Sequence, residues 1–494
     1  MNKINKILIA NRGEIAIRIM RAATELGIKT VAIYSHEDRL ALHRFKADES
    51  YLIGEGLGPV KAYLDGKDIL RIAKLVGADA VHPGYGFLSE DPEFADACNE
   101  AGIRFIGPKA QAMRDLGNKV AAREIAIKAD VPVIPATGPL PKDMSKVHEM
   151  VEKVGYPIML KASWGGGGRG MRVIRSADEL ENQVNEGQRE AANAFGKDEV
   201  YLEKMVERAR HIEVQVLGDT HGNIVHRVER DCSVQRRNQK VIERAPAAFM
   251  SNEERDALCQ AALKLARSVD YSNAGTVEFL MDMDTGEFYF IEVNPRIQVE
   301  HTVTEVVTGI DLVKAQILIA DGEKIGSKRS GVPKQKNIKL NGFALQCRIT
   351  TENPEDNFVP DYGRITAYRG ATGFGIRLDG GTAYSGAVIT RFYDSMLEKI
   401  TAWAPDPEQA VERMKRALRE FRIRGLATNL NFLENLINHP TFKDGSYTTR
   451  FIDQTPELFS FKPRKDRATK LLNFISEITV NGNKEVKGRR LPIE

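Results

Sequence analysis

The sequence predicts a protein of mixed α/β and α+β class with about three domains. Its 494 residues are 42% hydrophobic and 28% charged, which is the composition of ordinary globular domains. Residues 1–115 alternate short apolar runs with helix-forming segments. Residues 116–335 instead carry many β-forming segments separated by turns. A change of this kind along the chain predicts a parallel sheet followed by antiparallel structure.

The first region repeats a cycle of strand, turn and helix. Residues 6–10 are apolar and stop at Asn11-Arg12-Gly13, after which residues 14–27 favour a helix. Apolar runs recur at residues 30–34, 78–82 and 103–106. We therefore expect a parallel, Rossmann-like sheet. The glycine fingerprint of dinucleotide binding is missing from the first turn, so a nicotinamide cofactor is not favoured.

The later regions are richer in β structure. Residues 116–335 are expected to form antiparallel hairpins. Residues 336–455 begin with a strand at 343–350, continue with glycine-rich hairpins over 363–381 and end in a helical run over 411–425. Residues 456–494 are expected to form one amphipathic helix and one strand, which would begin a further domain.

Charge and apolar patterning exclude several classes of protein. The chain has 71 basic and 68 acidic residues, a net charge of +3, which argues against a nucleic-acid partner held by bulk charge. No run of 18 apolar residues occurs and the first apolar run is too short for a signal peptide, so neither export nor a membrane span is expected. The four cysteines, Cys98, Cys232, Cys259 and Cys347, lie far apart and are typical of reduced thiols in a cytoplasmic protein.

Four consecutive glycines, Gly165 to Gly168, lie between two predicted strands. Such a loop can close over an anion and present its backbone N–H groups to phosphate oxygens. Lys161 on the incoming strand could add a positive charge, while the alternative is a merely flexible loop. A Walker loop is excluded, because no Gly-Lys pair is followed by Ser or Thr.

A predicted hairpin brings acidic side chains together. If residues 276–294 fold back near Thr285, then Glu278 and Glu292 lie opposite one another, and Asn294 shares the face of Glu292. Opposed like charges need a cation between them, and oxygen ligands suit Mg²⁺ or Mn²⁺ that bridges nucleotide phosphates. The alternative is a solvated strand face on which the two glutamates never meet.

Two further segments indicate a site for small anions. Arg296, Gln298 and Glu300 alternate, and they share one side if this segment stays extended. Residues 229–240 carry Arg230, Arg236, Arg237 and Lys240 without interleaved aromatic residues, which favours a small anion over nucleic acid. An exposed charged loop is the alternative for this basic segment. His211 is interpreted as a strand-end histidine or as a ligand.

These motifs together resemble the biotin carboxylases of the ATP-grasp superfamily. The matching segments occur in order over about the first 450 residues and include KILIANRGEIAIRI, HPGYGFLSE, LKASWGGGGRGMRV, ERDCSVQRRNQK and FIEVNPRIQVEHTVTE. The resemblance implies a Rossmann-like N-terminal biotin carboxylase domain over 1–115 and an ATP-grasp domain over 116–335, with a mobile glycine-rich lid at about 134–205. It also implies a β-rich biotin carboxylase C-terminal domain over 336–455 and the start of a linker or allosteric domain over 456–494.

The resemblance also implies roles for individual residues. The ATP-binding positions are Lys119, Lys161, Gly167, Gly168, Glu203, Lys204, Val206, His211, Gln235, Asn238 and Glu278. The metal ligands are Glu278, Glu292 and Asn294, in agreement with the hairpin argument. The bicarbonate and biotin site holds Lys240, Arg296, Gln298, Val299 and Arg348, and Glu300 is the general base. Asn238 departs from the family, in which many members carry His, and it cannot bear a charge.

The implied activity is the carboxylation of the N1′ nitrogen of biotin by bicarbonate and ATP, with Mg²⁺ or Mn²⁺, through carboxyphosphate. The last residues resemble the exit from this domain in single-chain pyruvate carboxylases, so we expect a fragment of such an enzyme that converts pyruvate to oxaloacetate. No A/V-M-K-M biotinylation sequence occurs, so biotin would arrive on a carrier domain of the same full-length chain or of another subunit, beside a carboxyltransferase. Dimers through this domain and tetramers of the full enzyme are implied.

Two alternatives stay open. The first is a biotin carboxylase component of an acetyl-CoA or other acyl-CoA carboxylase. The second, from another class, is a catalytically silent nucleotide-binding or scaffolding module. That second reading is disfavoured because Lys240, Arg296, Glu300 and Arg348 are all present.

Overall fold

The computed structural model describes residues 3–163, 171–195, 198–461 and 467–483. Its N-terminal region contains a parallel sheet in the order β3-β2-β1-β4-β5, as the sequence predicts. The strands are β1 (Lys6–Ile9), β2 (Lys29–Tyr34), β3 (Glu49–Leu52), β4 (Ala80–His82) and β5 (Arg104–Phe105). The helices are α1 (Gly13–Glu25), α2 (Leu42–Lys46), α3 (Pro59–Leu64), α4 (Gly66–Leu75) and α5 (Pro92–Glu100).

The turn after β1 positions the loop after β4. Gly13 has a φ of +62°, a conformation that glycine adopts at low cost, and α1 begins there. The Asn11 side chain donates 2.7 and 2.8 Å hydrogen bonds to the carbonyls of Pro83 and Tyr85. Residues 83–91 are thereby attached to the carboxyl end of β1, where open α/β sheets place their ligands.

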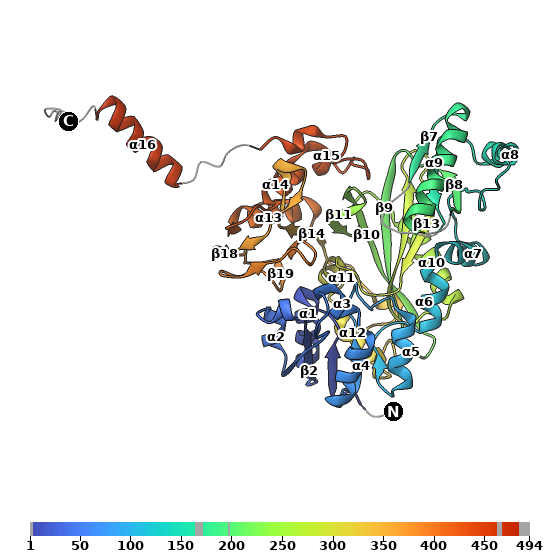
Figure 1. Ribbon diagram of the computed structural model, residues 1–494, viewed down its shortest axis with the longest axis horizontal. Coiled ribbons are helices and arrows are strands. Elements are labelled where there is room, and N and C mark those ends of the chain that lie inside the picture. Colours follow the sequence, from blue (N-terminus) through green and yellow to red (C-terminus); the bar gives the residue numbers. More distant parts are fainter. Residues whose placement is uncertain (1–2, 164–170, 196–197, 462–466, 484–494) are drawn as a thin grey trace.

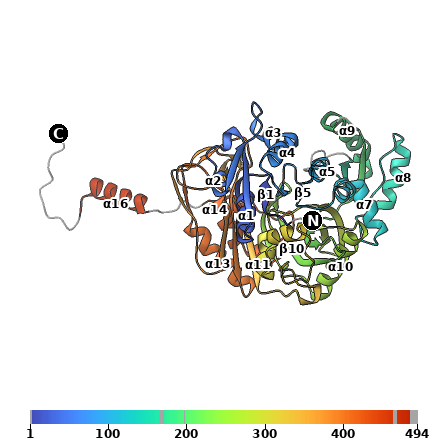
Figure 2. The same cartoon turned by 90° about the horizontal axis from the view of Figure 1, so that it is seen from below.

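A separate antiparallel sheet, in the order β7-β6-β8, lies within residues 134–205, the segment expected to form a lid. Its strands are β6 (Ile158–Ala162), β7 (Arg172–Ile174) and β8 (Val200–Lys204), flanked by α8 (Met144–Val154) and α9 (Ala177–Phe195). Helices α6 (Ala110–Gly117) and α7 (Lys119–Lys128) lead into it. The predicted glycine run, with Gly167 and Gly168, lies outside the described residues. Figures 1 and 2 show the lid and the C-terminal region on opposite sides of the central strands.

The largest sheet is antiparallel and crosses the predicted domain boundary. Its order is β13-β12-β9-β10-β11-β14-β21-β19. Five strands come from the second region: β9 (Ala209–Gly218), β10 (Ile224–Arg236), β11 (Gln239–Ala245), β12 (Asn273–Asp282) and β13 (Phe288–Asn294). Three come from the third: β14 (Phe343–Thr350), β19 (Ile376–Gly380) and β21 (Met396–Ala404). Pairing of β11 with β14 therefore joins the second and third regions in one sheet.

Helices pack against this sheet and contribute side chains to the hydrophobic cores. They are α10 (Asn252–Ser268), α11 (His301–Thr308), α12 (Leu312–Ala320), α13 (Pro407–Glu420), α14 (Leu430–Asn438) and α15 (Pro440–Lys443). Helix α10 begins with a capping box in which Ser251 and Glu254 exchange bonds, a signature of helix starts. All four cysteines are free and buried, as expected.

The third region differs from the expectation in two places. Its short strands β17 (Gly363–Arg364) and β18 (Ala367–Arg369) pair with β20 (Val388–Ile389) and β22 (Arg422–Arg424), and β19 pairs with β21. The glycine-rich residues 363–381 therefore do not form hairpins with one another. The predicted helix over 411–425 stops at Glu420, because residues 422–424 are drawn into the pairing with β18. The remaining pair is β15 (Glu352–Asn353) with β16 (Val359–Pro360).

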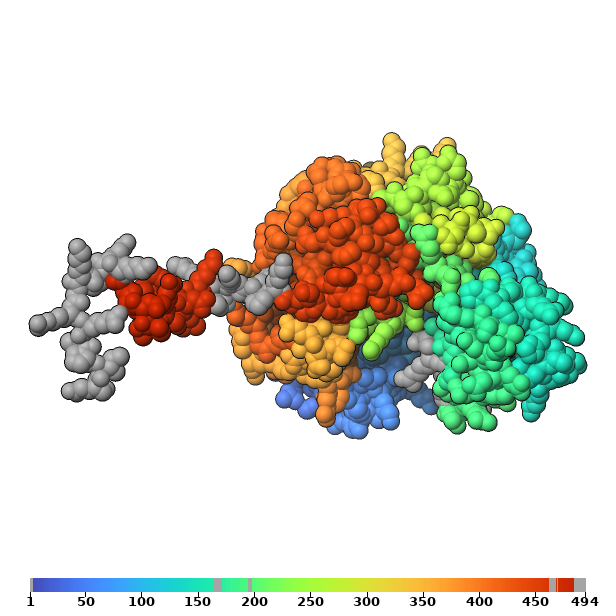
Figure 3. Space-filling model, turned by 90° about the horizontal axis from the view of Figure 1, so that it is seen from above, coloured from blue at the N-terminus to red at the C-terminus, as the bar shows by residue number. Residues whose placement is uncertain are grey.

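Among the described residues after Phe461, the chain forms one helix, α16 (Arg467–Asn481), where a helix followed by a strand is expected. This helix lies apart from the rest of the described chain (Figures 1 and 3), and its Leu471, Leu472 and Phe474 side chains are exposed. Among the helices of the described ranges, none combines the length and apolar character needed to cross a membrane.

Burial of Glu398 makes stability depend on pH. Glu398 is 1% exposed, and both of its carboxylate oxygens accept from the Tyr368 hydroxyl at 2.9 and 2.8 Å. Burial raises the pKa of Glu398 to about 7, although the Tyr368 hydrogen bond opposes the shift. The folded chain therefore holds this proton more tightly than the unfolded chain does. The free energy of unfolding therefore falls as the pH rises through about 7 and Glu398 loses its proton. The decrease is up to about 3 kcal/mol.

We predict that Glu398→Gln, which stays neutral, is more stable than the wild type at pH 8.5 and loses this advantage at pH 5. The melting temperatures of both proteins, measured across this range, check the prediction. Glu412→Gln is the matched control, because the Glu412 side chain is 63% exposed. A difference between Glu398→Gln and wild type that does not change with pH would contradict the assignment.

Candidate functional site

One lysine and three carboxylates form the centre of the site. The ammonium of Lys240, on β11, lies 2.5 Å from Glu213 Oε2, 2.8 Å from Glu278 Oε1 and 2.7 Å from Glu300 Oε1. Glu213 and Glu278 are register partners on β9 and β12, while Glu300 lies in the turn before α11. All three glutamates are buried, so Lys240 offsets the repulsion between them.

The pKa values follow from burial and these contacts. Burial would lower the pKa of Lys240, but the surrounding glutamates outweigh it and raise the pKa well above its ordinary value. Burial would likewise raise the pKa of Glu300, but Lys240, Arg348 and Arg230 lower it below its ordinary value. Lys240 is therefore a cation and Glu300 an anion at neutral pH.

Arg230 contacts the cluster through Glu213. Its side chain on β10 is fully buried and forms an ion pair with Glu213. It donates at 2.8 Å to Gln215 and at 2.8 Å to Gln298, with further bonds to Thr276 and Thr304. The prediction that Arg230 helps to bind a small anion is wrong, because all of its N–H donors already bond to protein groups.

Two other basic residues of that segment, Arg236 and Arg237, have no described contact with the cluster. Arg236 donates to the carbonyl of Asn357, and its guanidinium lies 4.0 Å from the centre of the Phe358 ring. Arg237 and Asn238 have φ values of +50° and +62° and form the exposed turn between β10 and β11, a backbone conformation that Asn tolerates. Within the segment, Lys240 and Arg230 are therefore the basic residues that contact the cluster.

Arg348 contacts the opposite side of Glu300. Its Nη2 on β14 lies 3.0 Å from Glu300 Oε2, and its Nε lies 2.6 Å from Glu243 Oε1. Glu243 is also held by Gln346 at 2.8 Å. Glu300 is thus fixed between two cations, one from β11 and one from β14.

The strands that carry the expected metal ligands pair in the register that the hairpin argument predicts. Glu278 pairs with Glu292 across β12 and β13, and Thr276 pairs with Asn294. Asn294 donates to Glu278 at 2.9 Å, and Lys119 lies 3.3 Å from Glu292. Adjacent carboxylate and amide oxygens fit Mg²⁺ or Mn²⁺. His211 lies 2.8 Å from Glu278, and together with Glu213 these two residues form a group that could also hold a cation.

The segment with Arg296, Gln298, Val299 and Glu300 does not stay extended, so the alternation argument is wrong. It turns at Val299 and Glu300 before α11 begins. Gln298, just before this turn, donates a 2.8 Å hydrogen bond to Glu278. Arg296 contacts Asn294 at 3.0 Å and Glu90 at 3.1 Å.

Three of the residues expected to bind ATP, Lys161, Glu203 and Lys204, lie on strands β6 and β8 of the small sheet. Lys161 on β6 forms an ion pair with Glu203 on β8. Lys204 donates at 3.1 and 2.7 Å to the carbonyls of Gly155 and Tyr156, so its ammonium is attached to the lid backbone. Gln235 donates to the carbonyl of Cys232 at 2.9 Å. Val206 lies two residues after the end of β8.

Sequence reasoning missed Glu213, Glu243 and Glu90. Glu213 lies in a stretch in which polar and apolar residues alternate, Ile212-Glu213-Val214-Gln215-Val216, so its burial gives no local signal. Glu243 and Glu90 give no local signal either, since their partners Arg348 and Arg296 are distant in sequence.

Three family models match consecutive parts of the chain. They describe the biotin carboxylase N-terminal domain over residues 3–113, the ATP-binding domain of the carbamoyl-phosphate synthase L chain over 118–328 and the biotin carboxylase C-terminal domain over 346–454. A pyruvate carboxylase of Bacillus subtilis is 56% identical over 97% of this chain and 42% of its own length. The chain thus spans about two fifths of such relatives.

Solved structures agree with these matches. A pyruvate carboxylase of Rhizobium etli is 67% identical over the whole chain and 44% of its own length, with a TM-score of 0.89. The biotin carboxylase domain of the Hydrogenobacter thermophilus 2-oxoglutarate carboxylase, solved as a dimer with MgADP and bicarbonate, is 44% identical. That match covers 94% of this chain and 100% of the other, with a TM-score of 0.87. The chain therefore belongs to the biotin carboxylase family.

Proposed function

We propose that the chain carboxylates the N1′ nitrogen of biotin, using ATP and bicarbonate, by way of carboxyphosphate. The observation that carries this proposal is the contact of Glu300 with Lys240 at 2.7 Å and with Arg348 at 3.0 Å. Lys240 also contacts Glu278 at 2.8 Å. A group able to take a proton thus lies between an expected metal ligand and a cation able to stabilise an oxyanion.

ATP is assigned to the side of the cluster that faces the lid. Glu278, Glu292 and Asn294 would hold Mg²⁺ or Mn²⁺, which supplies charge neutralisation to the phosphates when bound. Lys119 and Lys161 would add positive charge, and backbone N–H groups at Gly167 and Gly168, outside the described residues, would donate hydrogen bonds to the phosphate oxygens. The remaining contacts are assigned to Glu203, Lys204, Val206, His211, Gln235 and Asn238.

Bicarbonate is assigned to Lys240, Arg296, Gln298 and Val299. A guanidinium can hold such a planar anion through two parallel hydrogen bonds. Glu300 would take the bicarbonate proton as the nucleophilic oxygen attacks the γ-phosphorus and the bond to ADP breaks. The lowered pKa of Glu300 makes it a weak base while both cations contact it. Its basicity rises when the substrate anions draw Lys240 and Arg348 away.

The second step joins carbon to nitrogen. Carboxyphosphate decomposes to CO₂ and phosphate, and the phosphate takes the proton from N1′ of biotin. Arg348 stabilises the negative charge that develops on the ureido oxygen, and N1′ then attacks CO₂. Exclusion of water by a closed lid would protect carboxyphosphate from hydrolysis.

We propose pyruvate as the final acceptor, with oxaloacetate as the product. The names and identities of the relatives support this choice over an acyl-CoA acceptor. Biotin and the carboxyl-transferring domain would then lie on the same full-length chain or on another subunit. The four buried, free thiols are consistent with a cytoplasmic site of action, whereas human and mouse relatives are named as mitochondrial.

We predict that ATP hydrolysis by the wild type requires bicarbonate and is stimulated by free biotin. Glu300→Gln should lower the bicarbonate-dependent rate by about 10²- to 10⁴-fold, because the amide cannot accept the proton.

Arg348→Ala should remove the stimulation by biotin while ATP still binds. Steady-state phosphate release and nucleotide titration measure these effects, and Arg416→Ala on the exposed face of α13 is the control. Hydrolysis indifferent to bicarbonate and biotin would refute the proposal.

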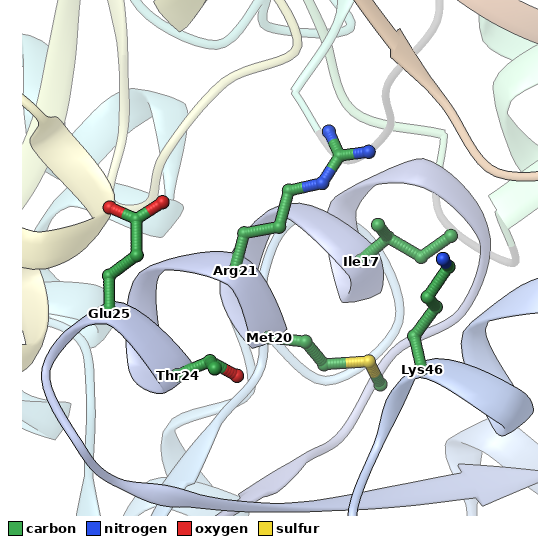
Figure 4. A pocket seen from close by; sticks show the side chains of 6 residues that line it. All are labelled: Ile17, Met20, Arg21, Thr24, Glu25 and Lys46. Carbon is green, nitrogen blue, oxygen red and sulfur yellow. The ribbon is translucent and has the colours of Figure 1, made fainter.

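We further propose that the chain forms dimers, as the biotin carboxylase domain from Hydrogenobacter does, and that full-length chains form tetramers. Figure 4 shows a hollow on the outer side of α1, lined by Ile17, Met20, Arg21, Thr24 and Glu25 together with Lys46 at the end of α2. Arg21 and Glu25 carry opposite charges one helical turn apart. Such a surface can form a two-fold contact with a second copy.

Charge reversal at this hollow tests the dimer. Light scattering after size exclusion should give twice the chain mass for the wild type and a monomer for Arg21→Glu, because the reversal places like charges together. Arg416→Glu is the control. A monomeric wild type, or a dimer that survives Arg21→Glu, would show that this assignment is wrong.

A further inference from the structure

Lys399 is a fully buried lysine outside the residues assigned to the reaction so far. It lies on β21 and is 0% exposed. Its ammonium donates a 2.7 Å hydrogen bond to the carbonyl of Val299 and lies 3.1 Å from Glu14 Oε1. Burial of an ammonium costs free energy unless its N–H donors have partners. The Val299 carbonyl and the Glu14 carboxylate therefore stabilise the buried charge of Lys399.

The contacts of Lys399 connect the three sequence regions. Lys399 itself belongs to the C-terminal region, Val299 lies in the turn before α11, and Glu14 lies in the first turn of α1. The Tyr85 hydroxyl donates to the same Glu14 oxygen, and the Lys399 ammonium lies 5.7 Å from the centre of the Tyr85 ring. The loop after β4 is thereby connected to the turn at Val299 through two side chains.

Val299 is the residue directly before Glu300. Because a peptide unit is planar, the hydrogen bond to the Val299 carbonyl also fixes the direction of the Glu300 N–H and the position of the Glu300 Cα, from which the side chain extends. The neighbouring turn is fixed by backbone bonds from His301 to Gln298 and from Val303 to Glu300, both 3.3 Å. Lys399 therefore acts on the one peptide that connects the assigned bicarbonate contact to the assigned base.

Other charged groups surround this lysine. On β19, Asp379 is its register partner and is held by Arg377 through Nε at 2.6 Å. On β14, its register partner is Arg348. Glu14 is its direct ionic partner, and the second oxygen of Glu14 is buried without a described hydrogen-bond donor. Loss of Lys399 alone would leave Glu14 as a buried, unpaired carboxylate.

We propose that Lys399 is a positioning residue for the bicarbonate step: it orients the Val299–Glu300 peptide, and Glu14 keeps its ammonium in place. This inference rests on the proposed function. It predicts an effect on bicarbonate that is much larger than any effect on ATP, because Lys399 contacts the turn and not the lid or the metal ligands. A lysine that only stabilised the fold would not separate the two substrates.

The test uses the double variant Glu14→Gln/Lys399→Met, which removes both charges together and leaves no unpaired carboxylate. Circular dichroism and the melting temperature verify that it is folded. We expect its KM for bicarbonate to rise by at least about tenfold while its KM for ATP stays within about twofold. The single variant Glu14→Gln keeps the bond from Lys399 to Val299, so its KM for bicarbonate should change by less than about threefold.

Lys415→Met is the matched control, because Lys415 pairs only with the exposed Glu412 among the described residues. A folded double variant with unchanged KM for bicarbonate would overturn the positioning role while leaving the proposed function intact. A parallel rise of both KM values would overturn it equally, since that result indicates a structural role. Wild-type hydrolysis without dependence on bicarbonate would refute the proposed function, and the role of Lys399 with it.

Discussion

The ammonium of Lys240 is the group on which the site depends. It holds Glu213, Glu278 and Glu300 within 2.8 Å, and these carboxylates could not share a buried space without it. Arg230 and Arg348 complete the balance of charge from β10 and β14. Because its cations are already paired with carboxylates, the site can exchange these internal ion pairs for pairs with phosphate and bicarbonate. In the proposed mechanism, substrate binding would draw Lys240 and Arg348 away from Glu300 and so make Glu300 a stronger base.

This cluster exists because one antiparallel sheet runs through two regions of the chain. Pairing of β11 with β14 places Glu243 opposite Gln346 and brings Arg348 beside the carboxylates of the second region. The helix after the turn is fixed in a similar way, since Glu305 on α11 accepts from Arg18 at 2.9 Å and from Arg377 at 2.6 Å. Arg18 belongs to α1 and Arg377 to β19. Three regions therefore determine where one short turn lies, which explains why Lys399 contacts that same turn.

The sequence predicts the local parts of this arrangement and fails on the distant ones. The facing of Glu278 and Glu292 is predictable because a turn and strand alternation lie within twenty residues of each other. The pairing of β17, β18 and β19 with distant strands is not, because glycine-rich sequences specify register weakly. Glu213, Glu243 and Lys399 are recognisable only after the sheet order is known. Family resemblance supplied Arg348, whose local sequence shows only a strand.

The central claim is that bicarbonate itself attacks the γ-phosphate at the Glu300 and Lys240 cluster. The most direct test supplies bicarbonate labelled with oxygen-18 to the wild type with MgATP and biotin, and measures the mass of the phosphate released. Attack by bicarbonate transfers one of its oxygens, so the account predicts phosphate that carries a single heavy oxygen. Phosphate without label would mean that water is the nucleophile, and it would contradict the account.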